Sequence, residues 1–463
     1  MLTFSNRRRS VVTALTIMLL AGSVCRAAPK PVPPSPYLPI AFRYVDAMLK
    51  QGRDTQGEQK TGLLLSALDR AKPGPLADRP AAPAGVDEAS RADSATGPLV
   101  GANPQHDQNL LRVLYALREL SNKPLYAEAA DAELKWFLQN ASPDAPVAAW
   151  DNGSAWDVAT DKLISADKQV SPDATRPWML WDRCFEIAPN ESKRLVQGLI
   201  AASAAGTATP RRTGATIRAL AVAYQHTGDQ SLLKAIEAAL GRLEKERSAG
   251  KSDPASEAAW LSAAIDCDGV ASRLPTELAT RLKAFAASVD QGFCALPHDL
   301  PGKGGFAVKS SGEKSDVQVT PLWQANVGGL TTAQVGMMCV SRTENTGSVN
   351  YRKLMQAAAD AYRDKLPPDD VDAWPMTYGH AISLQLAAWR ATSNQVYLDQ
   401  ARKLADAAVQ TFWGDDQLPR ASTKSKHYES ITGGDTLTLS LIDLHLSILG
   451  ITAVRTPPNT IDR

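Results

Sequence analysis

ALRELSNKPLYAEAAD (116–131), AYQHTGDQSLLKAIEA (223–238) and AWRATSNQVYLDQARK (388–403) are the stretches that decide the fold. In each, one amphipathic helix ends at a small polar triplet and a second begins, the pattern of a helical hairpin. The triplets are Ser121-Asn122-Lys123, Gly228-Asp229-Gln230 and Ser393-Asn394-Gln395. The segments start 107 and 165 residues apart, close to two and three times a unit of roughly 54 residues, which indicates a repeat protein.

Weaker copies of this pattern occur at Trp181–Ser192, Ile265–Thr276 and Cys339–Tyr351. Because one hairpin cannot bury its apolar face alone, about six or seven of them must stack on one another. We therefore predict an all-α fold, an (α/α)6-type toroid of helical hairpins, with an open α-solenoid as the alternative. Strand signals allow at most a small β-hairpin insertion, at Phe306–Val308 and Val317–Val319.

The N-terminus has the order of regions of a secretory signal peptide. Arg7–Arg9 precede an apolar run, Val11–Gly22, and a small-x-small cleavage site follows at Cys25–Ala27. The run is too short to span a bilayer, and no other stretch is typical of a membrane span. We predict export to the periplasm or the medium. The expected organisation is a signal peptide at 1–27, a Pro-rich lead at 28–37, one toroid domain at 38–450 and a tail at 451–463.

Composition and motifs exclude several classes of function. Lys+Arg 50 against Asp+Glu 49 leaves a net charge of +1, which gives no support to nucleic-acid binding. The sequences H-E-x-x-H, G-x-x-x-x-G-K-[ST], G-x-S-x-G and G-x-G-x-x-G are absent. No C-x-x-C occurs, and we interpret the four cysteines that remain after cleavage as buried apolar residues rather than metal ligands.

A long irregular stretch, Lys72–Pro98, is rich in Ala, Pro, Gly and Asp and cannot form a regular helix. A loop of that length within a compact domain is either disordered or functional. Arg53-Asp54 and Asp69-Arg70 precede it, and surface ion pairs are the simpler interpretation of these charges.

The segment Gly101–Asn109 precedes a strongly periodic helix, Leu110–Leu120. A helix that starts at Asn103 or Pro104 would carry His106, Asp107 and Asn109 in its first turn. A carboxylate there is favoured by the helix dipole. Capping is the simpler alternative, but it needs fewer polar groups than this segment provides.

Two further motifs combine tryptophan with charge. Residues 150–157 read as a loop in which Trp150 and Trp156 could stack on sugar rings while Asp157 accepts hydroxyl protons. Residues 176–183 contain Arg176, Trp178 and Asp182. An arginine side chain commonly binds a carboxylate through two parallel hydrogen bonds. Pro177 suits the start of a helix. Core packing and a buried ion pair are the structural alternatives.

The last motif lies near the end of the chain, before an expected helix at Thr436–Leu449. It contains His427, Tyr428, Glu429 and Asp435, with a glycine pair that allows close approach of a ligand. Upstream, Trp374–His380 opens another helix and contributes Tyr378 and His380. Capping and packing are again the alternative. We interpret His226, His298 and His445 as structural.

GANPQHDQNLLRVLYAL (101–117), RPWMLWDRCFEIAPNESKR (176–194) and HYESITGGDTL (427–437) together resemble a group of exported bacterial proteins with six-hairpin toroid folds. These proteins are pectate-lyase-like or are uronic-acid glycoside hydrolases of the β-glucuronidase type. The resemblance implies a funnel that binds an acidic oligo- or polysaccharide, without a cofactor; a lyase could also use Ca²⁺.

The chain departs from the pattern of these proteins in one place. They tend to have a Gly-Glu-His-like run after a Trp and a His-Glu before the Arg-Pro-Trp. Here residues 150–178, WDNGSAWDVATDKLISADKQVSPDATRPW, contain no Glu and no His. If those residues are catalytic in the relatives, this chain has changed its mechanism or lost activity.

Four functions therefore remain open, one of them a helical scaffold that binds other proteins. A glycoside hydrolase needs two carboxyl groups flanking the bond, and the available acids are Asp107, Asp157, Asp182, Glu429 and Asp435. A polysaccharide lyase needs a base and groups that neutralise the sugar carboxylate, which could come from His106, Asn109, Arg176, Tyr378, His380 and His427. A toroid that only binds glycans is the third reading. For a hydrolase we predict Glu429 as one carboxylate and Asp107 or Asp182 as the other.

Overall fold

A computed structural model describes residues 35–91, 98–140, 155–164, 176–205, 209–249, 254–310, 317–454 and 456–460. Within these ranges the chain is mainly helical, as predicted. Consecutive helices pack as hairpins: α2 (Gln108–Ser121) with α3 (Pro124–Asn140), α4 (Trp181–Ile187) with α5 (Pro189–Ala205), α6 (Pro210–Thr227) with α7 (Gln230–Ala249), α8 (Pro254–Val270) with α9 (Thr276–Cys294), α10 (Thr332–Thr346) with α11 (Val349–Ala361), and α12 (Pro375–Thr392) with α13 (Gln395–Ala408).

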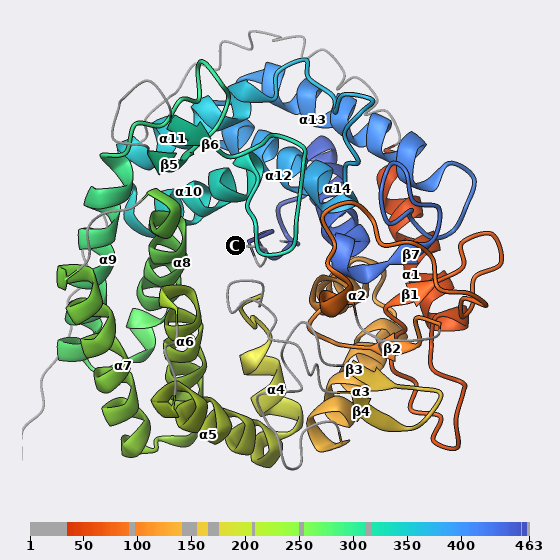
Figure 1. The fold of residues 1–463 in the computed structure, drawn as a ribbon, viewed down its shortest axis with the longest axis horizontal. Helices are drawn as coiled ribbons and strands as arrows, with labels where there is room; N and C mark the ends of the chain where they lie inside the picture. Colours follow the sequence, from red (N-terminus) through yellow and green to blue (C-terminus); the bar gives the residue numbers. More distant parts are fainter. Residues whose placement is uncertain are drawn as a thin grey trace, which may run out of the picture. The chain divides into compact units, whose positions relative to one another are not determined.

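The ring closes through the two ends of the domain. The last helix, α14 (Gly434–Leu449), packs against the first, α1 (Tyr37–Gln51), and also against α2 and α12. The even-numbered helices form the inner layer and the odd-numbered helices the outer layer (Figure 1). This arrangement is the predicted toroid of hairpins, and it brings residues near 107 and 435 together.

The turns within the helical hairpins lie at the small polar triplets found in the repeated segments. Asn122, Gly228 and Ser393 all have left-handed backbone conformation, with φ of 57°, 69° and 57°, and each directly follows the last residue of an inner helix. Gly347 does the same after α10 with φ 68°. This conformation ends a helix and satisfies one of its last carbonyls, so the small polar triplet is the sequence signature of the turn.

The inner helices run parallel to one another. Gly214 of α6 lies against Ala263 of α8, and the Ser383 hydroxyl of α12 meets that of Ser440 of α14 at 2.9 Å, while Arg390 further along α12 contacts Asp443 further along α14. The starts of the long inner helices therefore share one end of the ring, where their dipoles are positive, whereas the first turn of the short helix α4 lies beside the last turn of α6.

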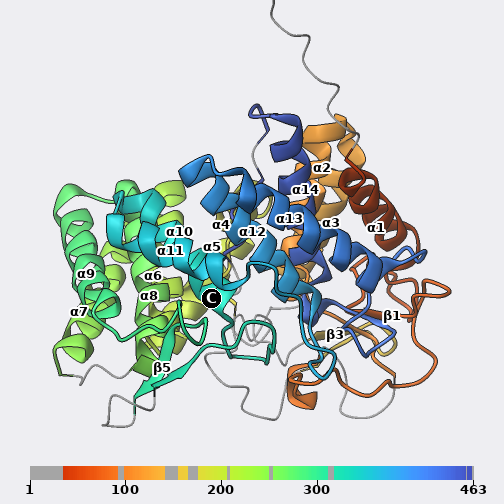
Figure 2. The ribbon, with the colours of Figure 1, turned by 90° about the horizontal axis from the view of Figure 1, so that it is seen from above.

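Small strand pairs accompany the long connections into the inner helices. The predicted hairpin is present as β5 (Ala307–Ser310) and β6 (Val317–Val319). Two further pairings were not predicted: β1 (Ala67–Leu68) with β7 (Tyr428–Glu429), and β2 (Gly101–Ala102) with β3 (Ala155–Asp157) and β4 (Lys162–Ile164). Figure 2 shows β1, β3 and β5 on the same side of the helices.

Single turns of other helix types complete the described structure. They are η1 (Glu88–Ser90), η4 (Ala271–Arg273), the π-helical η5 (Val409–Trp413) and η6 (Ser430–Thr432). The apolar core lies between the helical layers, and Cys184, Cys267 and Cys339 are buried in it as free thiols. No helix in the described ranges is long and apolar enough to cross a membrane.

Candidate active site

The segment before α2 is a turn rather than the first turn of the helix. The Asn103 side chain accepts from the backbone N–H of Gln105 at 2.9 Å, and the Asn103 carbonyl accepts from that of His106 at 2.9 Å. Asn103 thus stabilises a local turn that competes with a helix, and α2 begins only at Gln108. The prediction that His106 and Asp107 lie inside the helix was wrong; both precede it.

The starts of α2 and α14 are joined by side chains from two of the sequence motifs. One carboxyl oxygen of Asp435 accepts from the backbone N–H of Leu110 at 2.9 Å, and the other accepts from Thr436 at 2.7 Å. The Asn109 carboxamide donates to the Thr436 hydroxyl at 2.8 Å. Asp435 and Asn109 therefore hold the first and last inner helices together, which leaves them less free to bind a sugar than predicted.

Arg176 connects the same elements through backbone groups. Its guanidinium donates to the carbonyl of His106 at 3.0 Å and to that of Ile431 at 3.2 Å. No helix starts at Pro177, because residues 176–180 have no regular secondary structure and α4 begins at Trp181. Two of the guanidinium nitrogens that we predicted would read a sugar carboxylate thus bind the protein itself.

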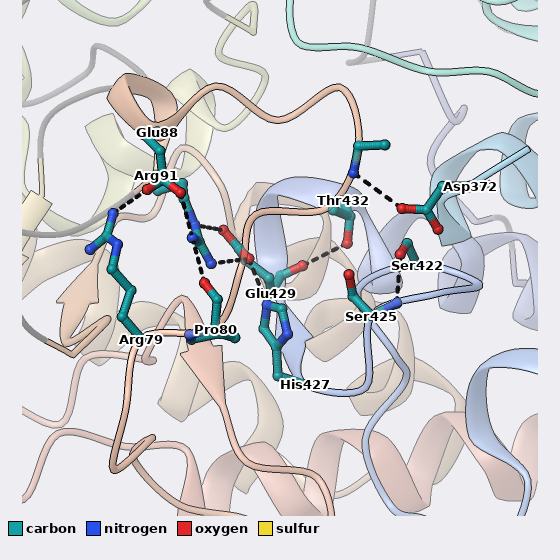
Figure 3. A network of polar contacts seen from close by, with 11 residues as sticks. Arg79, Pro80, Glu88, Arg91, Asp372, Ser422, Ser425, His427, Glu429 and Thr432 are labelled. Atoms are coloured by element: carbon teal, nitrogen blue, oxygen red, sulfur yellow. Dashed lines mark hydrogen bonds and ion pairs between the residues drawn. The ribbon is translucent and has the colours of Figure 1, made fainter.

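Glu429 is buried and bound by two cationic or ionisable side chains (Figure 3). Arg91 donates from Nε to Oε1 at 2.8 Å and from Nη2 to Oε2 at 2.9 Å, and His427 Nε2 lies 2.8 Å from Oε2. Burial alone would raise the pKa of Glu429, but the hydrogen bonds from His427 and Arg91 and the charge of Arg91 outweigh it and lower the pKa. Glu429 is therefore ionised at neutral pH.

The pKa of Asp107 is shifted in the opposite direction. It is completely buried, and neither carboxyl oxygen has a hydrogen-bond partner of good geometry in the described part of the chain. Burial raises its pKa well above the usual range, and the neighbouring acids Glu133 and Asp435 raise it further; the Ser430 hydroxyl and Arg176 act in the other direction. Burial also raises the pKa of Glu133 to about 8. The protonated form of Asp107 is therefore favoured more than that of an exposed aspartate.

The tyrosines of the candidate site belong to the core. Tyr428 and Glu429 alternate along β7, and the Tyr428 hydroxyl meets that of buried Tyr44 at 2.9 Å. Tyr378 packs against Trp323 and Phe412, with ring centroids 5.0 Å and 5.4 Å apart. Burial raises the pKa of Tyr378 to about 12. Packing covers both rings, which does not support the roles of Tyr428 in sugar binding and Tyr378 as a base; both roles stay predictions.

Asp182 does not join the site. Its carboxylate binds Arg273 at 2.8 and 2.9 Å and lies 3.2 Å from His226, which is in the last turn of α6. The charge and hydrogen bonds of these partners outweigh the effect of burial and lower the pKa of Asp182. Asp182 is in the first turn of α4, but its partners are in the last turn of α6 and just after α8, away from the cluster around Asp107. These contacts do not support Asp182 as a catalytic acid, and that role stays a prediction.

The remaining predicted residues have structural surroundings. Asp157 accepts from the backbone N–H groups of Ala159 and Thr160 at 2.9 and 3.1 Å, an Asx turn after β3. Trp156 packs edge-on against Trp136 at 4.8 Å, and Trp178 is also buried. His380 is buried in the second turn of α12. Trp150 lies outside the described residues.

Sequence reasoning missed Arg91 and Glu133. Arg91 lies in the irregular stretch, where no periodicity or motif distinguishes one arginine from another. Glu133 did have a signal, because it stands on the apolar stripe of α3 with Tyr126, Ala130 and Phe137. Among the described residues, no group of three or more His, Cys, Asp or Glu side chains is placed to hold a metal ion.

No family model matches the chain, and no curated protein matches it. Similar solved structures include the GH76A alpha-1,6-mannanase from Salegentibacter sp. HEL1_6, at 8% identity over 89% of this chain and 99% of that chain, with a TM-score of 0.46. Cellobiose 2-epimerase from Bacillus thermoamylovorans B4167 has 10% identity over 88% and 98%, with a TM-score of 0.46. An unsaturated glucuronyl hydrolase specific for heparin has 13% identity over 74% and 99%, with a TM-score of 0.41. These are carbohydrate-active enzymes, the class that the resemblance implied, but the similarity is too low to assign the chain to a family.

Proposed function

We propose that the chain is an exported carbohydrate-active enzyme, and specifically a glycoside hydrolase that acts on an acidic, uronic-acid-containing glycan. The observation that carries this proposal is that the surroundings of two buried carboxyl groups shift their pKa values in opposite directions, down for Glu429 and up for Asp107. Two acids whose surroundings move their pKa values apart are what glycoside hydrolysis requires, since one donates a proton and the other acts as a carboxylate.

Glu429 is suited to the role of the carboxylate. A carboxylate can accept about four hydrogen bonds, and Arg91 and His427 supply three of them. Those donors hold the group ionised and fix its orientation while one acceptor position remains for a sugar centre or an attacking water. A nucleophile or general base benefits from both effects, because its charge and direction are set before the substrate arrives.

Asp107 is suited to the role of the acid. It is beside Ser430, the residue that follows Glu429, so the two carboxyl groups belong to the same small region. Because Asp107 is buried, its proton can reach a glycosidic oxygen only when the surrounding groups move on substrate binding. A carboxylic acid whose pKa is raised by burial and by neighbouring acids holds its proton to higher pH and can then donate it.

The preference for an acidic glycan rests on the electrostatics of this end of the ring. The inner helices direct their positive N-terminal ends to it, and Arg176 and Arg211 lie at the same end. Anionic groups are favoured in such a field.

A hydrolase is favoured over a lyase by the state of the tyrosines. β-Elimination needs a base at C5 of the uronate, and with a pKa of about 12 only about one Tyr378 in 10⁵ is a phenolate at pH 7. Burial and the neighbouring negative groups also raise the pKa of Tyr428. Glycan binding without turnover remains the alternative, because residues 150–178 lack the Glu and His of the resembling proteins.

A panel of uronic-acid-containing glycans tests the proposal with two readouts, release of reducing sugar and absorbance of an unsaturated uronate. A hydrolase gives only the first. Glu429→Gln and Asp107→Asn should each reduce turnover by about two orders of magnitude or more with folding intact. Asp182→Asn is the matched control, because Asp182 pairs with Arg273 away from the site, and it should retain activity.

Two results would contradict the hydrolase. Unsaturated product would assign a lyase, and unchanged turnover in Glu429→Gln would remove Glu429 from the mechanism. Binding of glycans without turnover of any member of the panel would favour the non-catalytic function. For export, the N-terminal sequence of protein recovered from the periplasm or medium should begin near residue 28, and an intact Met1 would contradict it.

A further inference from the structure

Arg91 makes a complete set of contacts with groups around Glu429. Besides the two hydrogen bonds to the Glu429 carboxylate, its Nη1 donates to the Pro80 carbonyl at 3.0 Å and to Glu88 at 3.1 Å. The side chains of Arg91 and Glu429 are 0% and 4% exposed. A two-point fork of this kind fixes both the position and the plane of a carboxylate, which a single contact cannot do.

Arg91 does not belong to the helical ring that holds Glu429. It ends the segment Arg79–Arg91 of the irregular stretch, whose Val86 belongs to an apolar cluster with Trp374 and Met376 at the start of α12 and Ile431 of η6. Arg91 and Glu429 are 338 residues apart in the chain. The fork therefore exists only while this segment is docked on the ring.

Docking of the segment depends on a few contacts around Gly85. The indole N–H of Trp374 donates to the Ala84 carbonyl at 3.0 Å, and the backbone N–H of Val327 donates to the Gly85 carbonyl at 2.9 Å. Gly85 has φ +88°, and a Cβ there would lie 2.3 Å from the Ala325 carbonyl oxygen. Only glycine allows this approach, so residue 85 is a point where docking can be disturbed without touching Arg91.

We propose that Arg91 is the positioning residue for Glu429, and that docking of the segment Arg79–Arg91 delivers it to the site. The proposal rests on the proposed function only for the catalytic role of Glu429. Arg91 acts through Glu429 and need not touch the substrate. Docking of the segment thus fixes the orientation of the carboxylate and favours its charged form, and without it Glu429 keeps only the contact with His427.

The chemical consequence is a change in protonation with a definite sign. With Arg91 and His427 bound, the pKa of Glu429 lies below its ordinary value although burial acts to raise it. Removal of the guanidinium leaves the burial effect opposed by His427 alone, so the pKa rises. Loss of one close opposite charge typically raises a carboxyl pKa by about 1–3 units. The acid limb of the rate profile should move to higher pH by the same amount.

The test is a titration of Glu429 by NMR in the mature full-length chain labelled with [δ-¹³C]glutamate, with the Glu429 signal assigned from its loss in Glu429→Gln. Arg91→Met should raise the titration midpoint by about 1–3 pH units, and Arg91→Lys, which keeps the charge but loses the fork, by less. Gly85→Ala should raise it as well. Arg118→Met is the control: Arg118 is partly exposed near the end of α2 and pairs with the exposed Glu119, so the midpoint should stay at the wild-type value.

The titration does not depend on turnover, so it separates this inference from the proposed function. An unchanged midpoint in Arg91→Met, with near-UV circular dichroism like that of the wild type, would overturn the positioning role. A raised midpoint in Arg91→Met but not in Gly85→Ala would overturn delivery by the docked segment. If the wild type hydrolyses a glycan, the acid limb of kcat/KM must shift with the midpoint; a loss of rate without that shift would also count against the proposal.

Discussion

Replacement of Asn459 by Ala should destabilise the whole ring, although this residue lies in the tail that the sequence separates from the domain. The Asn459 carboxamide is buried between three inner helices. Its Nδ2 donates to the Ser440 hydroxyl at 2.9 Å and to the Thr436 carbonyl at 3.1 Å, and its Oδ1 accepts from Asn109 at 3.3 Å. Arg112 of α2 holds the preceding Pro458 carbonyl at 2.7 Å. The tail therefore ties the first inner helix to the last.

The size of the effect follows from these contacts. Three hydrogen bonds at about 0.5–1.5 kcal/mol each give a loss of roughly 1.5–4.5 kcal/mol. No further penalty is added for Asn109, because it keeps its bond to Thr436. The contact of Asn459 with Ser383 at 3.5 Å is too long to add to this sum. Asn459→Asp should cost more, since a carboxylate would face the Thr436 carbonyl.

Urea denaturation followed by circular dichroism measures the change in the free energy of unfolding. Asn140→Ala is the matched control, because the Asn140 side chain is exposed and donates only to the Trp136 carbonyl of its own helix; it should change stability by less than about 0.5 kcal/mol. If Asn459→Ala unfolds at the wild-type urea concentration, the tail does not contribute to closure of the ring and the reasoning fails.

Two further predictions concern stability. Because the pKa of Glu133 is raised in the folded state, its ionisation destabilises that state, and the wild type should lose on the order of 4 kcal/mol of stability as pH rises from about 4.5 to about 8. Glu133→Gln should abolish this loss. Equal dependence of the melting temperature on pH in the variant and the wild type would contradict this. Gly214→Ala should destabilise the protein by about 1–3 kcal/mol, since the added Cβ would lie 2.6 Å from the Ala263 Cα. Gly241→Ala on α7, which has open space around it, should stabilise the protein by about 0.5–1 kcal/mol. A higher melting temperature for both variants would contradict close packing of α6 on α8.

The protonation of the candidate site could not be read from the sequence. Glu429 and Asp107 were both chosen as acids next to a histidine, and nothing local distinguishes them. Their difference comes from partners far away in the chain: Arg91 for Glu429, and Glu133 and Asp435 for Asp107. Since a pKa depends on burial and on charges within a few ångströms, it is decided by which segments meet.

The sequence by itself determined the class of fold, the hairpin repeat and the end of the ring where the polar motifs gather. These depend on helical periodicity and on turn residues such as Asn122 and Gly228, whose effects act within one or two turns of backbone. Tertiary structure alone decided that Arg91 clamps Glu429, that Asp182 turns away to Arg273, and that the tail closes the ring through Asn459. These contacts join irregular segments to distant helices, and no local pattern encodes them because their energy arises only when the chain is folded.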